Sequence, residues 1–339
     1  GEKIVGYGYY DVDGMTSTAL LMKNIHALGG DVSYYIPNRF TEGYGINLAA
    51  LQQIAAEGCG LLVTVDCGIS SVQPIQEMHG AMDIIVTDHH LPGRELPAAL
   101  AVVNPHRADC SYPDKDLAGV GVAFKLAQAM QMIEKQRVWE DDMDIAALGT
   151  ISDLVPLVGE NRRIVRLGLA RMSENPCWGI RALIMAAGLE GKKINTGMVG
   201  FQLGPRMNAA GRIETARRGV DLLLSEDAQE AECIAGELNT LNAERRSLEQ
   251  DILAEAMLVD FTQDTPAIIA AGEDWNAGVI GIVASRLVDR YYRPSIVLTR
   301  QGDVYKGSCR SIAGLHMYKA LEACRETLIQ FGGHDMAAG

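Results

Sequence analysis

The chain has 339 residues, a length that suggests about two domains. Its hydrophobic content of 48% and mean hydropathy of +0.04 indicate a soluble globular protein with a sizeable core. The sequence contains neither a run of about 18 apolar residues nor a basic segment followed by a cleavage site, which argues against a membrane span and a secretory signal. We therefore expect a cytoplasmic protein that has no membrane partner.

Cysteine usage and charge limit the class of protein further. The seven cysteines are scattered and form no C-x-x-C pair, which argues against a disulfide framework and against structural zinc. The net charge of −13, taken alone, argues against a polyanionic partner, because Lys and Arg supply most of the affinity for nucleic acid. Local charge can differ, however, and basic residues that could meet a phosphate occur in glycine- and serine-containing loops, at Arg39, Arg206, Arg212 and Arg310.

Apolar strand-like runs and helical periodicities alternate over residues 1 to about 155. The predicted strands are 3–7, 32–36, 61–66, 82–87 and 101–104. The predicted helices are 16–28, with Thr16 or Ser17 as N-cap, 48–56 and 72–78. Strict alternation predicts a parallel sheet with helices on both faces, and right-handed connections would bring the strand ends to one edge.

Metal-ligand side chains follow the predicted strand at 82–87. Asp88, His89 and His90 stand together there, although each alone has a plainer explanation as a helix cap or a satisfied core histidine. Carboxylate oxygen and imidazole nitrogen suit a divalent ion such as Mn²⁺, and strand ends of parallel sheets carry the chemistry of α/β proteins. The pattern predicts a metal site at this edge of the sheet.

Further carboxylates follow the other strands. Asp11 and Asp13 come after the first strand and Asp66 after the third, so they can converge with His89. Asp153, which follows another apolar segment, either ends a helix before a turn or supplies a fifth ligand. Two ions about 3.5–4 Å apart, bridged by a shared carboxylate, would clamp a phosphoryl group, which makes phosphoester hydrolysis the expected chemistry.

The motifs resemble those of a known family. Residues 9–14, 65–68, 88–90 with 104–107, and 152–153 resemble, in order and spacing, the four phosphoesterase motifs of the DHH superfamily. Residues 117–123, 205–213 and 332–334 narrow the resemblance to the bacterial RecJ family of single-strand-specific 5′-to-3′ DNA exonucleases. The resemblance implies Mn²⁺ or Mg²⁺ as cofactor and catalytic roles for His90 and Asp88. The metal ligands that it implies are Asp11, Asp13, Asp66, His89 and Asp153.

Tyr9 departs from the family pattern. The family usually places an acid at this position of the first motif, and a phenol with a pKa of about 10 is a poor ligand for these ions. Either this acid is partly redundant in the family, or one of the two metal sites is weakened in this chain.

Residues 156–261 are predicted to be mainly helical and to connect the two domains. Apolar residues at three- and four-residue steps predict a long amphipathic helix over 226–260, suited to a strut that leaves a groove between two domains. Before it, Arg206, Asn208 and Arg212 lie in a segment rich in glycine and alanine. Two guanidinium groups there could fork onto phosphates, or the segment could be a helix-packing loop with surface arginines.

Residues 262–339 read as a second α/β unit, with strands at 267–271 and 295–298 and a helix that includes 278–284. Gly307–Ser311 would form an anion cradle from backbone N–H groups, hydroxyls and one guanidinium. This segment and the glycine-histidine segment at 332–334 resemble elements of the DHH-associated C-terminal domain. The resemblance implies substrate contacts for Ser308, Arg310, Gly333 and His334. RecJ proteins usually continue into an oligonucleotide-binding barrel, so we expect a fragment.

The combined interpretation is a two-domain α/β hydrolase: a DHH domain (1–155), a helical connector (156–261) and a smaller DHH-associated domain (262–339). It would remove nucleotides from the 5′ end of single-stranded DNA in repair and recombination, using Mn²⁺ or Mg²⁺ in the interdomain cleft. A single-strand-binding protein or a helicase is a candidate partner. Arg39, Ser308 and Arg310 would hold the terminal phosphate, unless Arg39 merely pairs with Glu42.

Two alternatives remain open at this stage. The first is a phosphodiesterase for short oligonucleotides or cyclic dinucleotides, an activity that other DHH members have. The second is a catalytically impaired scaffold that binds DNA or replication proteins, for which Tyr9 is the only support.

Overall fold

The computed structural model describes residues 1–43, 45–134, 139–259 and 265–339. They form two compact units, Gly1–Asn242 and Ala243–Gly339, and the boundary falls within helix α11 (Ala228–Ala256). Each unit contains one β-sheet with its own helices, which confirms the predicted two-part α/β architecture.

Unit 1 is organised around a five-stranded sheet in the order β2-β1-β3-β4-β5, and every neighbouring pair is parallel. The predicted parallel sheet is therefore confirmed, with strand ends shifted by no more than a residue. The strands are β1 (Lys3–Tyr7), β2 (Asp31–Tyr35), β3 (Leu61–Val65), β4 (Asp83–Thr87) and β5 (Ala101–Val103).

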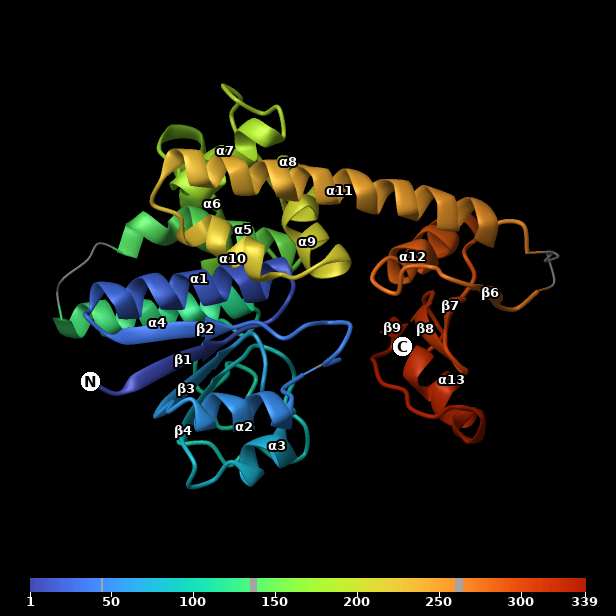
Figure 1. The fold of residues 1–339 in the computed structure, drawn as a ribbon, viewed down its shortest axis with the longest axis horizontal. Coiled ribbons are helices and arrows are strands. Elements are labelled where there is room, and N and C mark those ends of the chain that lie inside the picture. Colours follow the sequence, from blue (N-terminus) through green and yellow to red (C-terminus); the bar gives the residue numbers. More distant parts are fainter. Residues whose placement is uncertain (44, 135–138, 260–264) are drawn as a thin grey trace. The chain divides into compact units, whose positions relative to one another are not determined.

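Helices cover both faces of this sheet (Figure 1). On one face, α1 (Val12–Ala27), α4 (Gly119–Glu134) and α5 (Met143–Ser152) share a large apolar core with β3. On the other face, α2 (Leu48–Ala56) and α3 (Val72–Glu77) pack over a smaller core. Burial on both sides explains why the strands are continuous apolar runs rather than alternating patterns.

The predicted start of the first helix is wrong. We expected Thr16 or Ser17 as N-cap, but both are buried within α1, and Asp11 is the N-cap. Its Oδ1 accepts a hydrogen bond from the Gly14 N–H over 2.9 Å. The glycine at 14 hid the first turn from the sequence pattern, yet it is required there because a Cβ would come within 2.6 Å of the Tyr9 carbonyl.

The rest of unit 1 is helical and packs onto the α1 face (Figure 1). No helix in the described part of the chain is long and apolar enough to cross a membrane. The elements are the 3₁₀ turn η1 (Trp139–Asp142), α6 (Gly159–Glu174), α7 (Trp178–Ala186), α8 (Thr196–Met198), the π-helical turn η2 (Val199–Leu203), α9 (Gly204–Ile213), α10 (Arg217–Leu224) and the first half of α11.

The segment that contains Arg206 and Arg212 is not a loop, as we had expected, but helix α9. Its small residues do allow close backbone approach. A Cβ on Gly211 would clash with the carbonyl oxygen of Tyr10, so α9 lies directly against the segment that enters α1.

Unit 2 contains the second half of α11 and a four-stranded sheet in the order β6-β7-β8-β9. The first pair is parallel and the other two are antiparallel. Gly307–Arg310, which we had predicted as an anion-binding loop, belongs to strand β8 and pairs with β7. The elements are β6 (Ile268–Gly272), α12 (Ile280–Tyr291), β7 (Ser295–Gln301), β8 (Val304–Arg310), α13 (Met317–Ala323), the 3₁₀ turn η3 (Arg325–Thr327) and β9 (Ala337–Ala338).

Candidate active site

The carboxyl edge of the unit 1 sheet brings together most of the predicted metal ligands. Asp66 directly follows β3, His89 lies two residues after β4, and Asp13 stands in the first turn of α1, just beyond β1. Asp153 arrives from a different direction, at the C-cap of α5. Because β1, β3 and β4 are adjacent and parallel, their ends deliver these side chains to one place.

The Nε2 atom of His89 lies at the centre of this cluster. It is 3.2 Å from Oδ1 of Asp66 and 3.7 Å from one carboxylate oxygen each of Asp13 and Asp153. Two overlapping groups have ligand atoms within 4.8 Å of one another: Asp66, His89 and His90, and Asp13, His89 and Asp153. The structure therefore offers two adjoining sets of ligands that share His89. Whether Asp66 bridges two ions stays a prediction.

The protonation state of His89 indicates which kind of group fits at the centre of this cluster of side chains. Burial lowers its pKa to about 4, so the ring is neutral near pH 7. Its Nε2 is buried and has no hydrogen-bond partner among the described residues. This Nε2 faces Oδ1 of Asp66, which is likewise buried and without a hydrogen-bond partner among the described residues. A buried imidazole nitrogen and a buried carboxyl oxygen that face each other without a hydrogen bond fit a shared cation.

Burial and mutual repulsion also act on the carboxyl groups. Burial, followed by the charge of Asp11, raises the pKa of Asp13 to about 7. Burial, followed by the charges of Asp13 and Asp11, raises the pKa of Asp153 to about 9. The pKa of Asp66 is raised well above its ordinary value, first by burial and then by Asp13 and Asp11. Such carboxyl groups hold protons until a cation replaces them.

Close packing places the two innermost carboxylates. Asp66 has a left-handed backbone, with φ of 60°, and Gly119 lies so near that a Cβ there would be 2.6 Å from Oδ1 of Asp66. The carboxylate of Asp13 accepts the N–H groups of Gly119 and Val120 over 2.6 and 2.8 Å, at the start of α4. The glycine at 119 is thus required by the site. Its only signal in the sequence is its place in the motif at 117–123.

Asp11 has a different position from the other predicted ligands. Its Oδ1 caps α1, and among the described residues it belongs to neither group of clustered ligand atoms. Its charge nevertheless helps to raise the pKa values of Asp13, Asp66 and Asp153. Its role as a ligand stays a prediction.

Asp88 belongs to neither group of ligand atoms and instead positions His90, a member of the first group. Its buried carboxylate accepts the N–H groups of Ile69 (2.9 Å), His89 (2.7 Å) and His90 (3.1 Å), and it lies 2.7 Å from Nδ1 of His90. Burial would raise the pKa of Asp88, but the hydrogen bond and charge of His90 lower it overall. Burial likewise opposes protonation of His90, but Asp88 outweighs it and raises the His90 pKa. His90 can therefore hold a proton at Nε2.

A second layer supports the two histidines. Asn104 Nδ2 donates to the carbonyl of His90 over 2.9 Å, and Asn104 Oδ1 accepts the N–H of His106. Nδ1 of His106 lies 2.7 Å from the carbonyl oxygen of His89. The sequence identified this segment through the family resemblance but gave it no role. Its role is to hold the backbone of the histidine pair.

The basic residues predicted in unit 1 have distinct surroundings. Arg39 lies in the loop after β2, with its guanidinium carbon 5.1 Å from the centre of the Tyr10 ring. Arg206 donates to Oδ1 of Asn239 and to the carbonyl of Gln202, so it ties α9 to α11. Asn208 and Arg212 are partly exposed on α9.

The four residues predicted in unit 2 lie near β8 and β9. Nη1 of Arg310 donates to the Cys309 carbonyl (2.8 Å) and lies 3.2 Å from Oγ of Ser308. His334 is exposed, and its N–H bonds to the Ala337 carbonyl. Gly333 has φ of 145° and no room for a Cβ, which would lie 2.5 Å from the backbone of Ala338. Gly333 is thus required by close strand contact.

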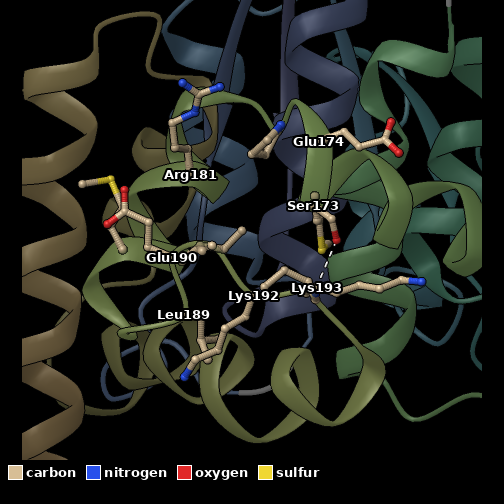
Figure 2. Close-up of a pocket in the computed structure, with 13 residues that line it drawn as sticks. Ser173, Glu174, Arg181, Leu189, Glu190, Lys192 and Lys193 are labelled. Atoms are coloured by element: carbon tan, nitrogen blue, oxygen red, sulfur yellow. Dashed lines mark hydrogen bonds between the residues drawn. The ribbon is translucent and has the colours of Figure 1, made fainter.

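Unit 1 also has a surface hollow that is lined by none of the predicted site residues. It has a volume of about 480 Å³ and lies between the end of α6, helix α7 and residues 189–194 (Figure 2). Arg181, Lys192 and Lys193 line it together with Glu174 and Glu190, so its charge is mixed. Among the residues that line it, the Ile194 N–H donates a hydrogen bond of 3.1 Å to Oγ of Ser173.

Comparisons with known proteins agree with this arrangement. The model of the DHH family, N-terminal domain, matches residues 3–150, and that of the DHHA1 domain matches residues 264–339. A crystal structure of exonuclease RecJ bound to manganese has a TM-score of 0.89 and 38% identity, and it covers all of this chain and 85% of the other. The chain belongs to the RecJ family of DHH proteins.

Curated RecJ proteins are similar along the whole chain. The single-stranded-DNA-specific exonuclease RecJ of Bacillus subtilis is 47% identical over 343 residues, and that of Escherichia coli is 42% identical over 365. The match covers 43% and 63% of those proteins, so the chain spans roughly half of their length. RecJ of Thermus thermophilus in complex with Mg²⁺ has a TM-score of 0.80 and 35% identity, covering all of this chain and 46% of the other.

Proposed function

We propose that this chain is the catalytic core of a metal-dependent exonuclease that removes nucleotides from the 5′ end of single-stranded DNA, in DNA repair and recombination. One observation carries the proposal: the buried Nε2 of His89, which has no hydrogen-bond partner among the described residues, lies within 3.7 Å of carboxyl oxygens of Asp13, Asp66 and Asp153. The RecJ relatives, which are named single-stranded-DNA-specific exonucleases, support the substrate.

The residues fit Mn²⁺ or Mg²⁺, the ions present in the related RecJ structures. Asp13, Asp66, Asp153 and His89 would hold the ions, with Asp11 as a further proposed ligand. Carboxylate oxygen and imidazole nitrogen are typical ligands of Mn²⁺. When bound, the ions would supply charge for the carboxylate cluster and Lewis-acid activation of water and of a phosphoryl oxygen.

The protein's own contribution to the reaction is positioning and proton transfer. Asp88 fixes Nδ1 of His90, and its ionised carboxylate favours the protonated ring. We assign Nε2 of His90 to donating a hydrogen bond or a proton to the reacting phosphate. Asn104 and His106 hold the backbone that carries both histidines, so the ring keeps its orientation while the proton moves.

Direction of attack requires contacts with the strand terminus. We assign Arg39, Ser308 and Arg310 to the terminal 5′-phosphate, because a guanidinium fork and a neutral hydroxyl match phosphate oxygens. Among the described residues Arg39 has no ion pair, and Glu42 instead accepts from the Tyr35 hydroxyl and the Asn38 N–H. The remaining proposed substrate contacts are Arg206, Asn208, Arg212, Gly333 and His334.

The proposed substrate also suggests where in the cell the protein acts. We propose a cytoplasmic location, where an enzyme of DNA repair and recombination would meet its single-stranded DNA. A single-strand-binding protein or a helicase remains our proposed partner, because both work on the single strands that such an enzyme degrades.

The proposal is tested with oligonucleotides labelled at either end, incubated with this chain and Mn²⁺. We expect mononucleotides to appear first from the 5′ end of a single strand, no cleavage of a blunt duplex, and loss of activity with a chelator. Arg310→Ala and Arg39→Ala should reduce the preference for 5′-phosphorylated over 5′-hydroxyl strands, with Arg310→Ala having the larger effect.

The alternatives make different predictions. Faster hydrolysis of dinucleotides than of long strands would instead identify a small-substrate phosphodiesterase. DNA binding without hydrolysis at saturating Mn²⁺ would identify a scaffold. Equal losses on both substrates in the arginine variants would assign these residues to general DNA positioning.

A further inference from the structure

Tyr9 is part of a stack of three side chains that ends in Arg39. The Tyr9 side chain is buried, with 7% of its surface exposed, and packs in the core on the α2 face of the sheet. Its hydroxyl lies 2.5 Å from the Tyr10 hydroxyl, and the ring centres are 4.0 Å apart. The guanidinium of Arg39 lies over the Tyr10 ring. A buried residue is thus connected to a cation through one intermediate ring.

The intermediate ring is fixed at both ends. The Tyr10 backbone lies against α9, where Gly211 leaves no room for a Cβ beside the Tyr10 carbonyl. The Tyr10 hydroxyl is held by Tyr9. Since Asp11 follows immediately and caps α1, the ring has a defined position relative to the residues of the metal cluster.

Stacking on a ring leaves the donors of Arg39 available. A guanidinium that lies over an aromatic face keeps its N–H groups in its own plane, at its edge. In the described part of the chain Arg39 forms no hydrogen bond or ion pair, and nearby Glu42 is engaged by the Tyr35 hydroxyl (2.8 Å) and the Asn38 N–H (2.6 Å). The ring therefore orients the cation without consuming its phosphate-binding edge.

We propose that Tyr9 is a positioning residue for Arg39: its hydroxyl fixes the Tyr10 ring, and the ring aims the guanidinium at the terminal phosphate of the DNA strand. This inference rests on the proposed function, specifically on the contact of Arg39 with that phosphate. It gives a defined role to the buried phenol at position 9. Tyr9 touches neither substrate nor metal in this role.

The test compares Tyr9→Phe, which keeps the ring and its packing but removes the hydroxyl, with the parent chain. The readout is the ratio of kcat/KM for 5′-phosphorylated and 5′-hydroxyl single strands. A second readout is the ratio of their dissociation constants by fluorescence anisotropy in chelator, where no strand is cut. Loss of one hydrogen bond should lower both ratios about five-fold, with the Mn²⁺ requirement on 5′-hydroxyl strands unchanged.

Two further variants make the outcome decisive. Tyr112→Phe, which loses a hydroxyl bonded to Glu160 elsewhere in unit 1, is the matched control and should leave both ratios unchanged. Unchanged ratios in Tyr9→Phe, or equal losses on both substrates, would overturn the inference. Arg39→Ala distinguishes a failure of the Tyr9 inference from a failure of the proposed function. If Arg39→Ala lowers the ratios while Tyr9→Phe does not, only the Tyr9 inference fails. If Arg39→Ala keeps the ratios, the phosphate contact of the proposed function fails and the inference fails with it.

Discussion

Two clusters of buried acids in unit 1 differ in how their charges are compensated. Asp142 accepts Nδ2 of Asn24 at 3.1 Å and faces Nζ of Lys23 at 3.1 Å, although only 1% of its surface is exposed. Asp66, with 3% exposed, has an unpartnered Oδ1 that faces a neutral histidine. Asp142 and Asp66 are both almost fully buried, and among the described residues only Asp66 lacks a cationic partner.

The difference separates buried acids whose charge is balanced within the protein from those that need a proton or a cation. A buried carboxylate with a cation and hydrogen bonds already has what its charge requires, so it contributes to the fold. A buried carboxylate without them is tolerable only if it keeps a proton or receives a cation from outside. The raised pKa values of Asp13, Asp66 and Asp153 express that requirement.

The largest expected effect comes from Asp66→Asn. Asn tolerates the left-handed backbone of this position and keeps the side-chain volume, so the fold should survive while a metal-ligand charge is lost. We expect turnover on single strands to fall at least about 10³-fold, with weaker Mn²⁺ binding by calorimetry. Turnover within tenfold of the parent would contradict the role of Asp66.

Asp142→Ala tests the other cluster. It leaves Lys23 and Asn24 without their shared carboxylate, so the free energy of unfolding should fall by about 3 kcal/mol. The kcat of the folded fraction should not change, because this cluster does no chemistry. Urea titration and activity at low temperature measure the two quantities separately. A loss of kcat without a loss of stability would contradict the claim that Asp142 contributes to the fold and not to catalysis.

Asp88→Asn extends the comparison of buried acids to the candidate active site. Asp88 is buried there, but it has His90 and three backbone N–H groups as hydrogen-bond partners. The amide cannot hold a protonated His90, so the pKa of His90 should fall. We expect kcat to drop about 10- to 100-fold and the alkaline limb of the pH–rate profile to move to lower pH. An unshifted limb would show that His90 is not the acid.

The pH dependence of stability gives a smaller effect. A carboxyl group whose pKa is raised by folding stabilises the protein fully below about pH 4, and this contribution is lost as the pH rises through the folded pKa. With pKa values of about 7 for Asp13 and about 9 for Asp153, the metal-free chain should lose stability up to about pH 9. Thermal unfolding in chelator should show this decline, saturating Mn²⁺ should abolish it, and Asp153→Asn should reduce it. A flat metal-free profile would argue that these groups ionise freely.

The smallest effect is expected for Tyr9→Asp, measured on 5′-hydroxyl strands so that the terminal phosphate plays no part. An added carboxylate beside Asp11 and Asp13 should lower the Mn²⁺ concentration needed for half-maximal activity by a few-fold. Identical Mn²⁺ titrations would show that position 9 is not a ligand position in this chain.

The sequence by itself determined the sheet and the grouping of the ligand-type side chains. Strict alternation of apolar runs and helical periods predicted the parallel sheet of unit 1, because such a sheet is buried on both faces. Acids and histidines after successive strands predicted the metal cluster, because parallel neighbours end at one edge. Local pattern and one rule of topology suffice for this, and the structure brings Asp13, Asp66, His89 and Asp153 together, whereas Asp11 caps α1 outside both groups of ligand atoms.

Tertiary structure alone decided what depends on distant contacts. Gly119, Gly211 and Gly333 look alike in the sequence, and only the backbone or side chain opposite each one shows why a Cβ cannot be present. The helical state of 204–213 and the strand at 304–310 were missed because packing on α1 and pairing with β7 outweigh their local composition. Likewise, Asp142 and Asp66 are both buried acids, and only the folded chain shows that Asp142 has Lys23 as a cationic partner while Asp66 has none among the described residues.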